Sequence, residues 1–476
     1  MPRRLICVSN RIHLPGKAVA AGGLAVGVLG ALKRQGGLWF GWSGEHGEHP
    51  CRAPHIHDGG RVTFATIDLR RDEFDRYYNG FSNDALWPLL HYMPSKFRFR
   101  ESDWQAYDAV NARFADSLAP LLAPRDLVWI HDYHLIPLAR QLRERGARQP
   151  LGLFLHTPFP YFEVLRVLPR YRELLLDLLQ FDVIGFQTES DLLSFQSCVA
   201  RVFGSECVLG ERDVRCGDRT VATDVFPIGV EVDRLQEKAC EARASQAVER
   251  MMRSLLGRRL MIGVDRLDYS KGLVERFAAY EQFLEDRPEH RGRITYLQVA
   301  PLSRKDMQSY REIRRTLEQA AGRTNGRFGD ADWTPIRYIN RNVVRETLMG
   351  FMRAADVALV TPLRDGMNLV AKEYLAAQDP HDPGVLVLSE FAGAAQELDA
   401  ALQVNPYDST GVGEALQRAL AMPLAERKER HLALLKVLRR NDIATWANRF
   451  VAALRSVRPP GTYRLGQCER LVSDNE

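Results

Sequence analysis

Two carboxylates, a glycine and an asparagine lie close together in residues 361–373, after the apolar run that follows Asp356. The apolar run Val357–Val360 is typical of a strand covered on both faces, and Gly366 allows a tight turn after it. Asn368 can cap a helix that begins near Leu369, so the first N–H groups of that helix would point out of the turn. Such N–H groups, together with the positive end of the helix dipole, form an anion site.

The carboxylates of this stretch, Asp365 and Glu373, stand at opposite ends of the turn. A carboxylate repels phosphate but accepts hydrogen bonds from hydroxyl groups. The pattern therefore indicates a sugar held by its hydroxyls while its phosphates lie on backbone amides. The alternative is an ordinary strand-to-helix corner with solvated charges, which the dense polar insert between two apolar runs disfavours.

A second cluster, with two fixed cations, follows the predicted strand Arg259–Val264. Arg266 and Lys271 are five residues apart, just before Gly272 and a predicted helix. Two cations at a helix N-terminus would neutralise a diphosphate leaving group. Arg304, at the end of the next strand, would add a third cation. The alternative is a surface charge cluster, which is less consistent with a turn that an apolar strand directs toward a cleft.

In the first half of the chain, polar residues collect after the C-terminal ends of strands, where open α/β sheets bind ligands. His131 and His134 do not suggest a metal pair, because they stand at a strand end rather than on a helix and no third ligand is evident. For His156 a structural role and a site role are equally supported. The candidates are Arg11 after Arg4–Val8, Asp132 after Asp126–Ile130, and His156 after Leu151–Leu155.

A glycine pair and an aromatic-rich segment add weaker signals. Gly22 and Gly23 precede the predicted helix Leu24–Arg34. A strand, a glycine turn and a helix in this order form a phosphate-cradling arrangement, but the G-x-G-x-x-G dinucleotide fingerprint is absent after the first strand. Tyr78 and Trp87 lie among Asn, Gly and Ser rather than at helical spacing, so their O–H and N–H groups can serve a ligand while the rings pack.

The order of predicted strands and helices indicates two α/β domains, each with a parallel sheet and its own core. The first spans residues 1–230 and the second 231–440, with the crossing near Pro227–Val230. The amphipathic segment Leu424–Arg455 is predicted as one long helix-like tail, and residues 458–476 as loosely ordered.

The overall composition is consistent with a soluble globular enzyme that acts on small molecules. The chain has 476 residues, 45% hydrophobic and 26% charged, and a formal charge of +5 without long basic blocks, which argues against a dedicated nucleic-acid binder. Seven scattered cysteines without a C-x-x-C pair indicate free thiols in a reducing compartment. The N-terminal apolar run Leu5–Val8 is too short for a signal peptide core, and no stretch approaches the length of a membrane span. We therefore expect a cytoplasmic protein with no membrane partner; a homo-oligomer, dimer or tetramer, stays open.

Eight motifs of the chain resemble those of the trehalose-6-phosphate synthase family, in its bacterial single-function form, from about residue 4 to 455. They are VSNR (8–11), AGGL (21–24), FGW (40–42), WIHDYH (129–134), FLHTPFP (154–160), GFQT (185–188), VDRLDYSKG (264–272) and TPLRDGMNLVAKE (361–373). The resemblance implies a GT-B fold, with two Rossmann-like domains facing across a cleft and a helix at 441–457 returning to the first domain. It implies retaining transfer of glucose from UDP-glucose to glucose 6-phosphate, giving α,α-trehalose 6-phosphate and UDP, without a metal or cofactor.

The resemblance also implies residue roles toward the donor. Arg266 and Lys271 would grip the diphosphate, Glu373 the ribose, and Asp365 with His156 the transferred glucose. Backbone near the donor would come from Gly22, Gly23, Gly366, Met367, Asn368, Leu369 and Val370.

Toward the acceptor, the resemblance implies that Asp132 and Trp42 orient the sugar ring. The 6-phosphate would bind to Arg11, Tyr78, Trp87 and Arg304. The implied catalytic set is Arg266, Lys271, Asp365, His156 and Asp132.

Retention at the sugar carbon suggests front-face attack, because the sequence singles out no carboxylate for a covalent route. Side chains alone do not decide between UDP, GDP and ADP. The rivals are glucosyl transfer to glycerol 3-phosphate, a pseudo-glycosyl coupling enzyme, and a non-catalytic sugar-phosphate sensor. The sensor is disfavoured because Arg266, Lys271, Asp365 and Glu373 are all present, and a nicotinamide oxidoreductase is disfavoured for want of the fingerprint.

Overall fold

The computed structural model describes residues 3–12, 14, 23–48, 53–302 and 308–457. The chain divides into two compact units: unit 1 comprises Met1–Pro227 with Ala444–Glu476, and unit 2 comprises Ile228–Ile443. Gly22, Arg304 and the predicted loose tail 458–476 lie outside the described residues.

Unit 1 is built on a sheet of ten strands among the described residues, in the order β3-β4-β2-β1-β5-β6-β7-β10-β9-β8. From β4 to β10 neighbouring strands are parallel, and antiparallel pairs occur at both edges. The central strands are short and fully buried, as expected for a sheet covered on both faces. The strands are β1 (Leu5–Arg11), β2 (Gly37–His46), β3 (His55–Asp58), β4 (Val62–Leu69), β5 (Leu127–His131), β6 (Leu151–Phe154), β7 (Val183–Phe186), β8 (Val208–Leu209), β9 (Asp213–Cys216) and β10 (Arg219–Val225).

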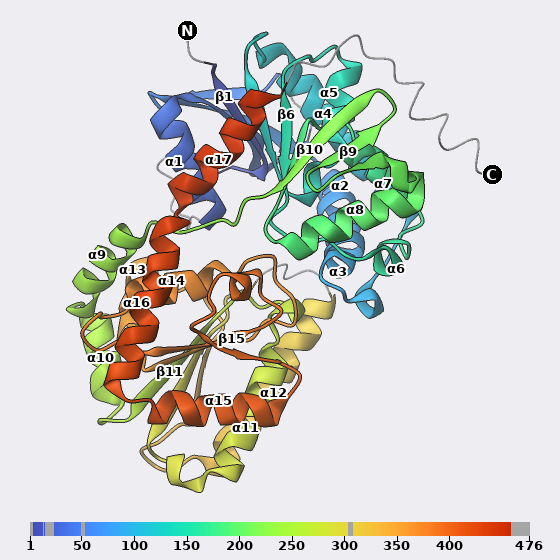
Figure 1. The fold of residues 1–476 in the computed structure, drawn as a ribbon. Helices are drawn as coiled ribbons and strands as arrows, with labels where there is room; N and C mark the ends of the chain where they lie inside the picture. The colour runs from blue at the N-terminus through green and yellow to red at the C-terminus, as the bar shows by residue number, and fades with distance from the viewer. Residues whose placement is uncertain (1–2, 13, 15–22, 49–52, 303–307, 458–476) are drawn as a thin grey trace. The chain divides into compact units, whose positions relative to one another are not determined.

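Helices connect these strands and cover the sheet (Figure 1). They are α1 (Gly23–Gln35), α2 (Arg71–Phe74), α3 (Trp87–Leu90), α4 (Glu101–Leu118), α5 (Leu138–Glu144), α6 (Phe162–Leu165), α7 (Tyr171–Leu178), α8 (Glu189–Phe203) and, from the C-terminal end, α17 (Ile443–Ser456). A π-type helical segment, Asp75–Leu86, joins α2 to α3 and carries the aromatic-rich stretch.

Unit 2 is a parallel sheet of six strands among the described residues, in the order β13-β12-β11-β14-β15-β16. The strands are β11 (Arg259–Val264), β12 (Ile294–Val299), β13 (Ile336–Ile339), β14 (Val357–Val360), β15 (Val385–Ser389) and β16 (Leu402–Val404). In Figure 1, helices α9, α13, α14 and α16 lie on one side of this sheet and α11, α12 and α15 on the other. The helices are α9 (Val232–Arg243), α10 (Gln246–Ser254), α11 (Leu273–Asp286), α12 (Gln308–Phe328), α13 (Arg345–Ala354), α14 (Leu369–Ala377), α15 (Ser409–Ala421) and α16 (Leu424–Arg440).

Each sheet has a switch point, where the chain builds strands first to one side and then to the other. In unit 1 it lies between β1 and β5, and in unit 2 between β11 and β14. The prediction of two doubly wound α/β sheets is therefore confirmed. The edge strands β3, β8 and β9 were not predicted, because they are short and β3 is fully exposed, so it carries no buried apolar run.

The predicted helix-like tail Leu424–Arg455 is two helices rather than one: α16 ends at Arg440 and α17 begins at Ile443, close to the helix 441–457 that the family resemblance implied. Asn441, which ends α16, has φ −110° and ψ 50°, outside helical geometry, and its side chain donates from Nδ2 to Glu397 at 2.5 Å. The carbonyl oxygen of Asn441 also lies against Gly229, where an added Cβ would approach it to 1.9 Å. Both contacts of Asn441 are made with residues far away in the sequence. An amphipathic pattern of side chains along Leu424–Arg455 carries no sign of them.

Helix α17 packs its apolar face on the sheet of unit 1. Trp446 and Phe450 each lie 4.8 Å, centroid to centroid, from the ring of Trp129 on β5. Phe450 approaches the sheet at Gly152 and Gly185, where any Cβ would lie 2.8 Å from its ring. These two glycines on neighbouring strands make the room that the helix occupies.

Replacing Gly185 by alanine should therefore destabilise unit 1, because the new methyl group would meet Phe154, Phe226 and Phe450 at 2.8–2.9 Å. Overpacking of this kind costs about 1–3 kcal/mol. Urea unfolding followed by tryptophan fluorescence measures the loss. Gly322→Ala on α12 is the matched control: its methyl group meets nothing within 4 Å, so its stability should stay the same or rise slightly. Equal stability of the two variants would contradict this account of the packing.

Candidate active site

An ion pair marks the switch point of the sheet in unit 2. Lys271, on the loop after β11, donates from Nζ to Oδ2 of Asp365, on the loop after β14, at 2.5 Å. The same oxygen accepts a hydrogen bond from Nδ2 of Asn368 at 2.9 Å. Only 11% of the Lys271 side chain and 13% of the Asp365 side chain are exposed. The predicted cation and the predicted sugar-binding carboxylate thus meet where a doubly wound sheet binds its ligand.

The loop after β11 is shaped to fit against β14. Gly272 has φ +62°, and a Cβ there would lie 2.2 Å from the carbonyl oxygen of Thr361. The N–H of Leu363 donates to the carbonyl of Ser270 at 2.8 Å. Only glycine combines this backbone conformation with so close an approach.

A buried arginine, which the sequence reasoning missed, lies beneath both loops. Arg276 on α11 donates to Asp265 at 2.6 Å, to Thr361 Oγ1 at 2.9 Å and to Gln298 at 3.0 Å. It also donates to the carbonyl of Lys271 at 3.1 Å. Burial raises the pKa of Asp265, and the charge of Arg276 opposes that rise. Arg276 looks like one charge of a solvated helix, so sequence offered no signal for this role.

The start of α14 has the predicted capping arrangement. Asn368 adopts φ +76° and accepts a hydrogen bond at Oδ1 from the N–H of Ala371 at 3.2 Å. The turn before it is held by hydrogen bonds from Gly393 N–H to the carbonyl of Asp365 and from Ala394 N–H to the carbonyl of Met367. The helix therefore begins at Leu369, one residue after the cap, as the sequence predicted.

Glu373, one turn further along α14, has a partner that was not predicted. Arg345 donates to Glu373 at 2.8 Å, and 14% of the glutamate side chain is exposed. Burial raises the pKa of Glu373, while the charge of Arg345 lowers it. Arg266 stands exposed on the loop after β11.

In unit 1 the switch point carries a strained aspartate and two histidines. Asp132, directly after β5, has φ +76° and ψ 166°, a conformation that is common only for glycine. Its Oδ1 accepts the N–H of His156 at 3.3 Å. The Nδ1 of His131 lies 3.3 Å from the Nε2 of His156, a distance that allows a hydrogen bond between the rings.

Burial keeps both imidazoles uncharged. It lowers the pKa of His156 to about 3 and lowers the pKa of His131 well below its usual value. His156 therefore offers hydrogen bonds and not a positive charge at neutral pH.

An aromatic cluster in unit 1 includes three of the predicted acceptor residues. The guanidinium of Arg11 lies 5.5 Å from the ring centre of Trp42, and Tyr78 stacks between Phe74 (4.9 Å) and His134 (5.5 Å). Phe74 also contacts Trp42 at 5.0 Å, which joins the two groups.

Trp87 joins this region indirectly, because its buried ring lies 5.8 Å from Tyr133, the neighbour of Asp132. Its closest ring contact is His91, at 3.9 Å.

The predicted site residues thus form one group in each unit. Unit 2 holds Arg266, Lys271, Asp365, Gly366, Met367, Asn368, Leu369, Val370 and Glu373. Unit 1 holds Arg11, Trp42, Tyr78, Trp87, Asp132 and His156, with Gly23 as the first residue of α1. Among the described residues, no group of three or more His, Cys, Asp or Glu side chains could hold a metal ion. None of the described helices is both long and apolar enough to cross a membrane.

Two doubly wound α/β units, each with polar side chains gathered at the switch point of its sheet, define the class: the fold is that of a GT-B glycosyltransferase. Residues 15–456 match the family model of glycosyltransferase family 20. The chain belongs to this family.

Named relatives are similar over nearly the whole chain. A trehalose-6-phosphate synthase of Klebsiella pneumoniae is 50% identical over 457 residues, 96% of each chain. A UDP-forming α,α-trehalose-phosphate synthase from Burkholderia xenovorans, solved in complex with glucose 6-phosphate, is 48% identical, with TM-score 0.90 over 95% of this chain and 100% of that one. An Escherichia coli structure named for trehalose 6-phosphate and bound with UDP-2-fluoro glucose is 48% identical, with TM-score 0.90 over 96% and 100%.

The uncharged state of His156 gives a prediction about pH. The unfolded chain binds a proton at this histidine below about pH 6.5, whereas the folded chain binds it only near pH 3. The free energy of unfolding should therefore fall as the pH drops from about 6.5 toward 3, because the unfolded state binds more protons in that window. Urea unfolding at pH 7.5 and pH 5.5 should show a smaller loss for His156→Gln than for the unchanged chain. An equal loss would show that His156 titrates alike in both states.

Proposed function

We propose that this chain transfers glucose from UDP-glucose to glucose 6-phosphate with retention, forming α,α-trehalose 6-phosphate and UDP. The observation that carries the proposal is the Lys271–Asp365 pair at the switch point of unit 2, in a chain about 50% identical to named trehalose-6-phosphate synthases over 96% of its length. A sensor protein would need neither group. The buried pair instead supplies a cation for phosphate and a carboxylate for sugar hydroxyls at one point.

In unit 2 the donor would meet a charge arrangement suited to its leaving group. The ammonium of Lys271 and the exposed guanidinium of Arg266 would offset the charge that grows on the diphosphate as its bond to glucose breaks. The capped start of α14 would present backbone N–H groups to the same phosphates. Asp365 would hold the glucose hydroxyls, and Glu373, oriented by Arg345, the ribose hydroxyls.

In unit 1 the acceptor would meet Arg11, Tyr78 and Trp87 through its 6-phosphate. Arg11 is an exposed residue whose guanidinium lies 5.5 Å from the ring centre of Trp42. The carboxylate of Asp132 would accept hydrogen bonds from sugar hydroxyls. The uncharged imidazole of His156 would exchange hydrogen bonds with them as well. Arg304, which belongs to unit 2, would add a cation for the same 6-phosphate, whereas Gly22 and Gly23 of unit 1 would present backbone amides to the donor; Gly22 and Arg304 lie outside the described residues.

We propose front-face attack for the chemical step. The bond from the anomeric carbon to the diphosphate oxygen breaks, and the anomeric hydroxyl of the acceptor forms the new bond on the same face. That hydroxyl passes its proton to the departing diphosphate oxygen, so UDP leaves protonated and no enzyme carboxylate is alkylated. Trapping a covalent glucosyl-enzyme would exclude this route.

The proposal includes a cytoplasmic location. Its substrates are phosphorylated, and the described cysteines Cys7, Cys198, Cys207 and Cys240 are free thiols, which suits a reducing compartment.

The reaction is tested by UDP release from UDP-glucose with and without glucose 6-phosphate, with the sugar product identified by NMR. Acceptor-dependent UDP release with a 1,1-linked α,α product is expected. GDP-glucose, ADP-glucose and glycerol 3-phosphate serve as comparison substrates. Turnover only with another acceptor would overturn the named reaction, and sugar-phosphate binding without turnover of any donor would favour the sensor.

Lys271→Met should lower kcat about 10²- to 10³-fold, because it removes a cation from the developing charge of the leaving diphosphate. Lys428→Met, an equal loss of charge at an exposed position on α16, is the control and should leave kcat unchanged. Thermal unfolding of both variants separates a folding defect from a chemical one. A kcat for Lys271→Met within twofold of the unchanged enzyme would remove Lys271 from the mechanism.

Metal removal should leave activity unchanged, because the proposed cations are Arg266 and Lys271 and not a divalent ion. The measurement is the initial rate after dialysis against EDTA, with and without added Mg²⁺. A rate that falls on dialysis and returns with Mg²⁺ would show that a metal supplies part of the charge.

A further inference from the structure

The turn 132–136, which follows β5, contains the strained residue Asp132 and depends on hydrogen bonds from neighbouring elements. A non-glycine residue with the φ and ψ of Asp132 costs roughly 1–3 kcal/mol and persists only where the surroundings impose it. Asp132 itself is held by its N–H, which donates to the carbonyl of Phe154 at 2.8 Å, and by its carbonyl, which accepts from Leu135 at 3.2 Å. The next two carbonyls, of Tyr133 and His134, are held by other parts of the chain.

Helix α4 supplies side-chain donors to both carbonyls. The hydroxyl of Tyr107 donates to the carbonyl of Tyr133 at 2.5 Å, and Nδ2 of Asn111 donates to the carbonyl of His134 at 3.1 Å. The hydroxyl of Tyr77 also lies 3.3 Å from the His134 carbonyl, but its shorter hydrogen bond, at 2.9 Å, goes to Oδ1 of Asn10. Tyr107 and Asn111 are one turn apart, so a single face of α4 grips two consecutive peptide groups of the turn.

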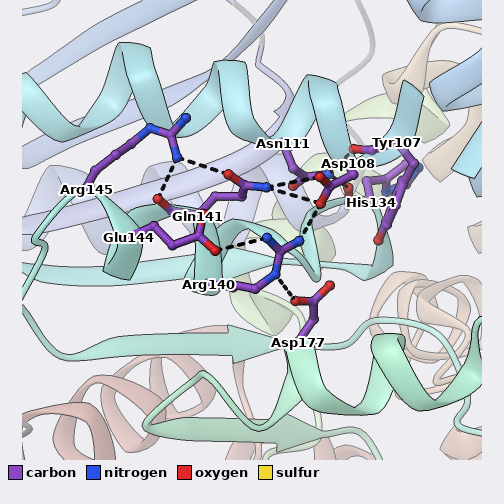
Figure 2. A network of polar contacts seen from close by, with 9 residues as sticks. All are labelled: Tyr107, Asp108, Asn111, His134, Arg140, Gln141, Glu144, Arg145 and Asp177. Carbon is purple, nitrogen blue, oxygen red and sulfur yellow. Dashed lines mark hydrogen bonds and ion pairs between the residues drawn. The ribbon is translucent and has the colours of Figure 1, made fainter. Parts of the chain in front are cut away.

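The helix that grips the turn is itself fixed by charge (Figure 2). Arg140 on α5 forms ion pairs with Asp108 on α4 and with Asp177 on α7, the latter at 2.6 Å. Gln141 donates to Asp108 at 3.1 Å. Asp108 lies between Tyr107 and Asn111 in sequence, so the network holds α4 at the point where it meets the turn.

We infer that Tyr107 and Asn111 are positioning residues for the acceptor. They hold the turn 132–136 so that Asp132 keeps its orientation and the ring of His134 stays stacked on Tyr78. This inference rests on the proposed function, which places Asp132 and Tyr78 at glucose 6-phosphate. It concerns residues that do not themselves touch the substrate.

The ring of Tyr107 packs independently of its hydroxyl, which makes the inference testable. The ring lies 4.5 Å from Phe81 and 5.9 Å from Tyr77, centroid to centroid. Tyr107→Phe keeps these contacts and removes only the hydrogen bond to the turn. Asn111→Leu keeps the branched shape of the side chain and removes the second donor.

The experiment measures kcat and the KM of each substrate for Tyr107→Phe, Asn111→Leu and the double variant, together with thermal unfolding and calorimetric binding of UDP. Each single variant should raise the KM of glucose 6-phosphate by roughly 2- to 10-fold, the loss expected for one hydrogen bond. The double variant should lose more. The KM of UDP-glucose and the affinity for UDP should stay unchanged.

Tyr280→Phe is the matched control, because its buried hydroxyl also donates to a backbone carbonyl, that of Pro335 at 3.3 Å, but in unit 2. It should leave the acceptor constants unchanged. Folded Tyr107→Phe and Asn111→Leu with unchanged acceptor constants would overturn the positioning role, as would a loss shared equally by both substrates. An inactive unchanged enzyme would overturn the proposed function and this inference with it.

Discussion

A buried guanidinium holds together the loops on which the chemistry of unit 2 depends. Arg276 donates to groups on the loop after β11, on β12 and just after β14. Breaking a buried charge pair from one side typically costs about 3–5 kcal/mol, which applies to Arg276 and Asp265, while the hydrogen bonds to Thr361, Gln298 and the Lys271 carbonyl tie the neighbouring segments to the same guanidinium. Because the partners belong to different strands, the contact at Arg276 sets where Lys271 and Asp365 meet. The exposed charge of Arg266 is added to loops whose positions are already set by the buried contacts of Arg276.

Each unit has a strained non-glycine residue close to the switch point of its sheet. Asp132 follows β5 and Asn368 precedes α14, and both have φ +76°. In each case side chains hold the conformation: Asn368 caps its own helix, whereas Asp132 depends on neighbouring elements. Backbone strain held by its surroundings is typical of sites where side chains must point in one direction.

Sequence reasoning reached as far as local patterns extend. It predicted the strands of both parallel sheets, the turn at Gly366 and the cap at Asn368, because apolar runs and capping residues are encoded within a few positions. It could not predict that Lys271 pairs with Asp365, since the two are 94 residues apart. The same limit applies to Arg345 with Glu373, which are 28 residues apart. The roles proposed for the site residues stay predictions until substrates are tested.

The order of the chain has a consequence for synthesis on the ribosome. Unit 2 is one continuous segment, and its two ends are tied together, since Lys372 binds both the carbonyl of Ile228 and Glu397, which in turn accepts from Asn441. Unit 1 is interrupted: its sheet is complete by residue 225, yet the helix that covers Trp129 is made only after unit 2. Domains fold as units during synthesis. Unit 1 is therefore incomplete until unit 2 has been synthesised. During that time the aromatic face around Trp129 is not yet covered by α17.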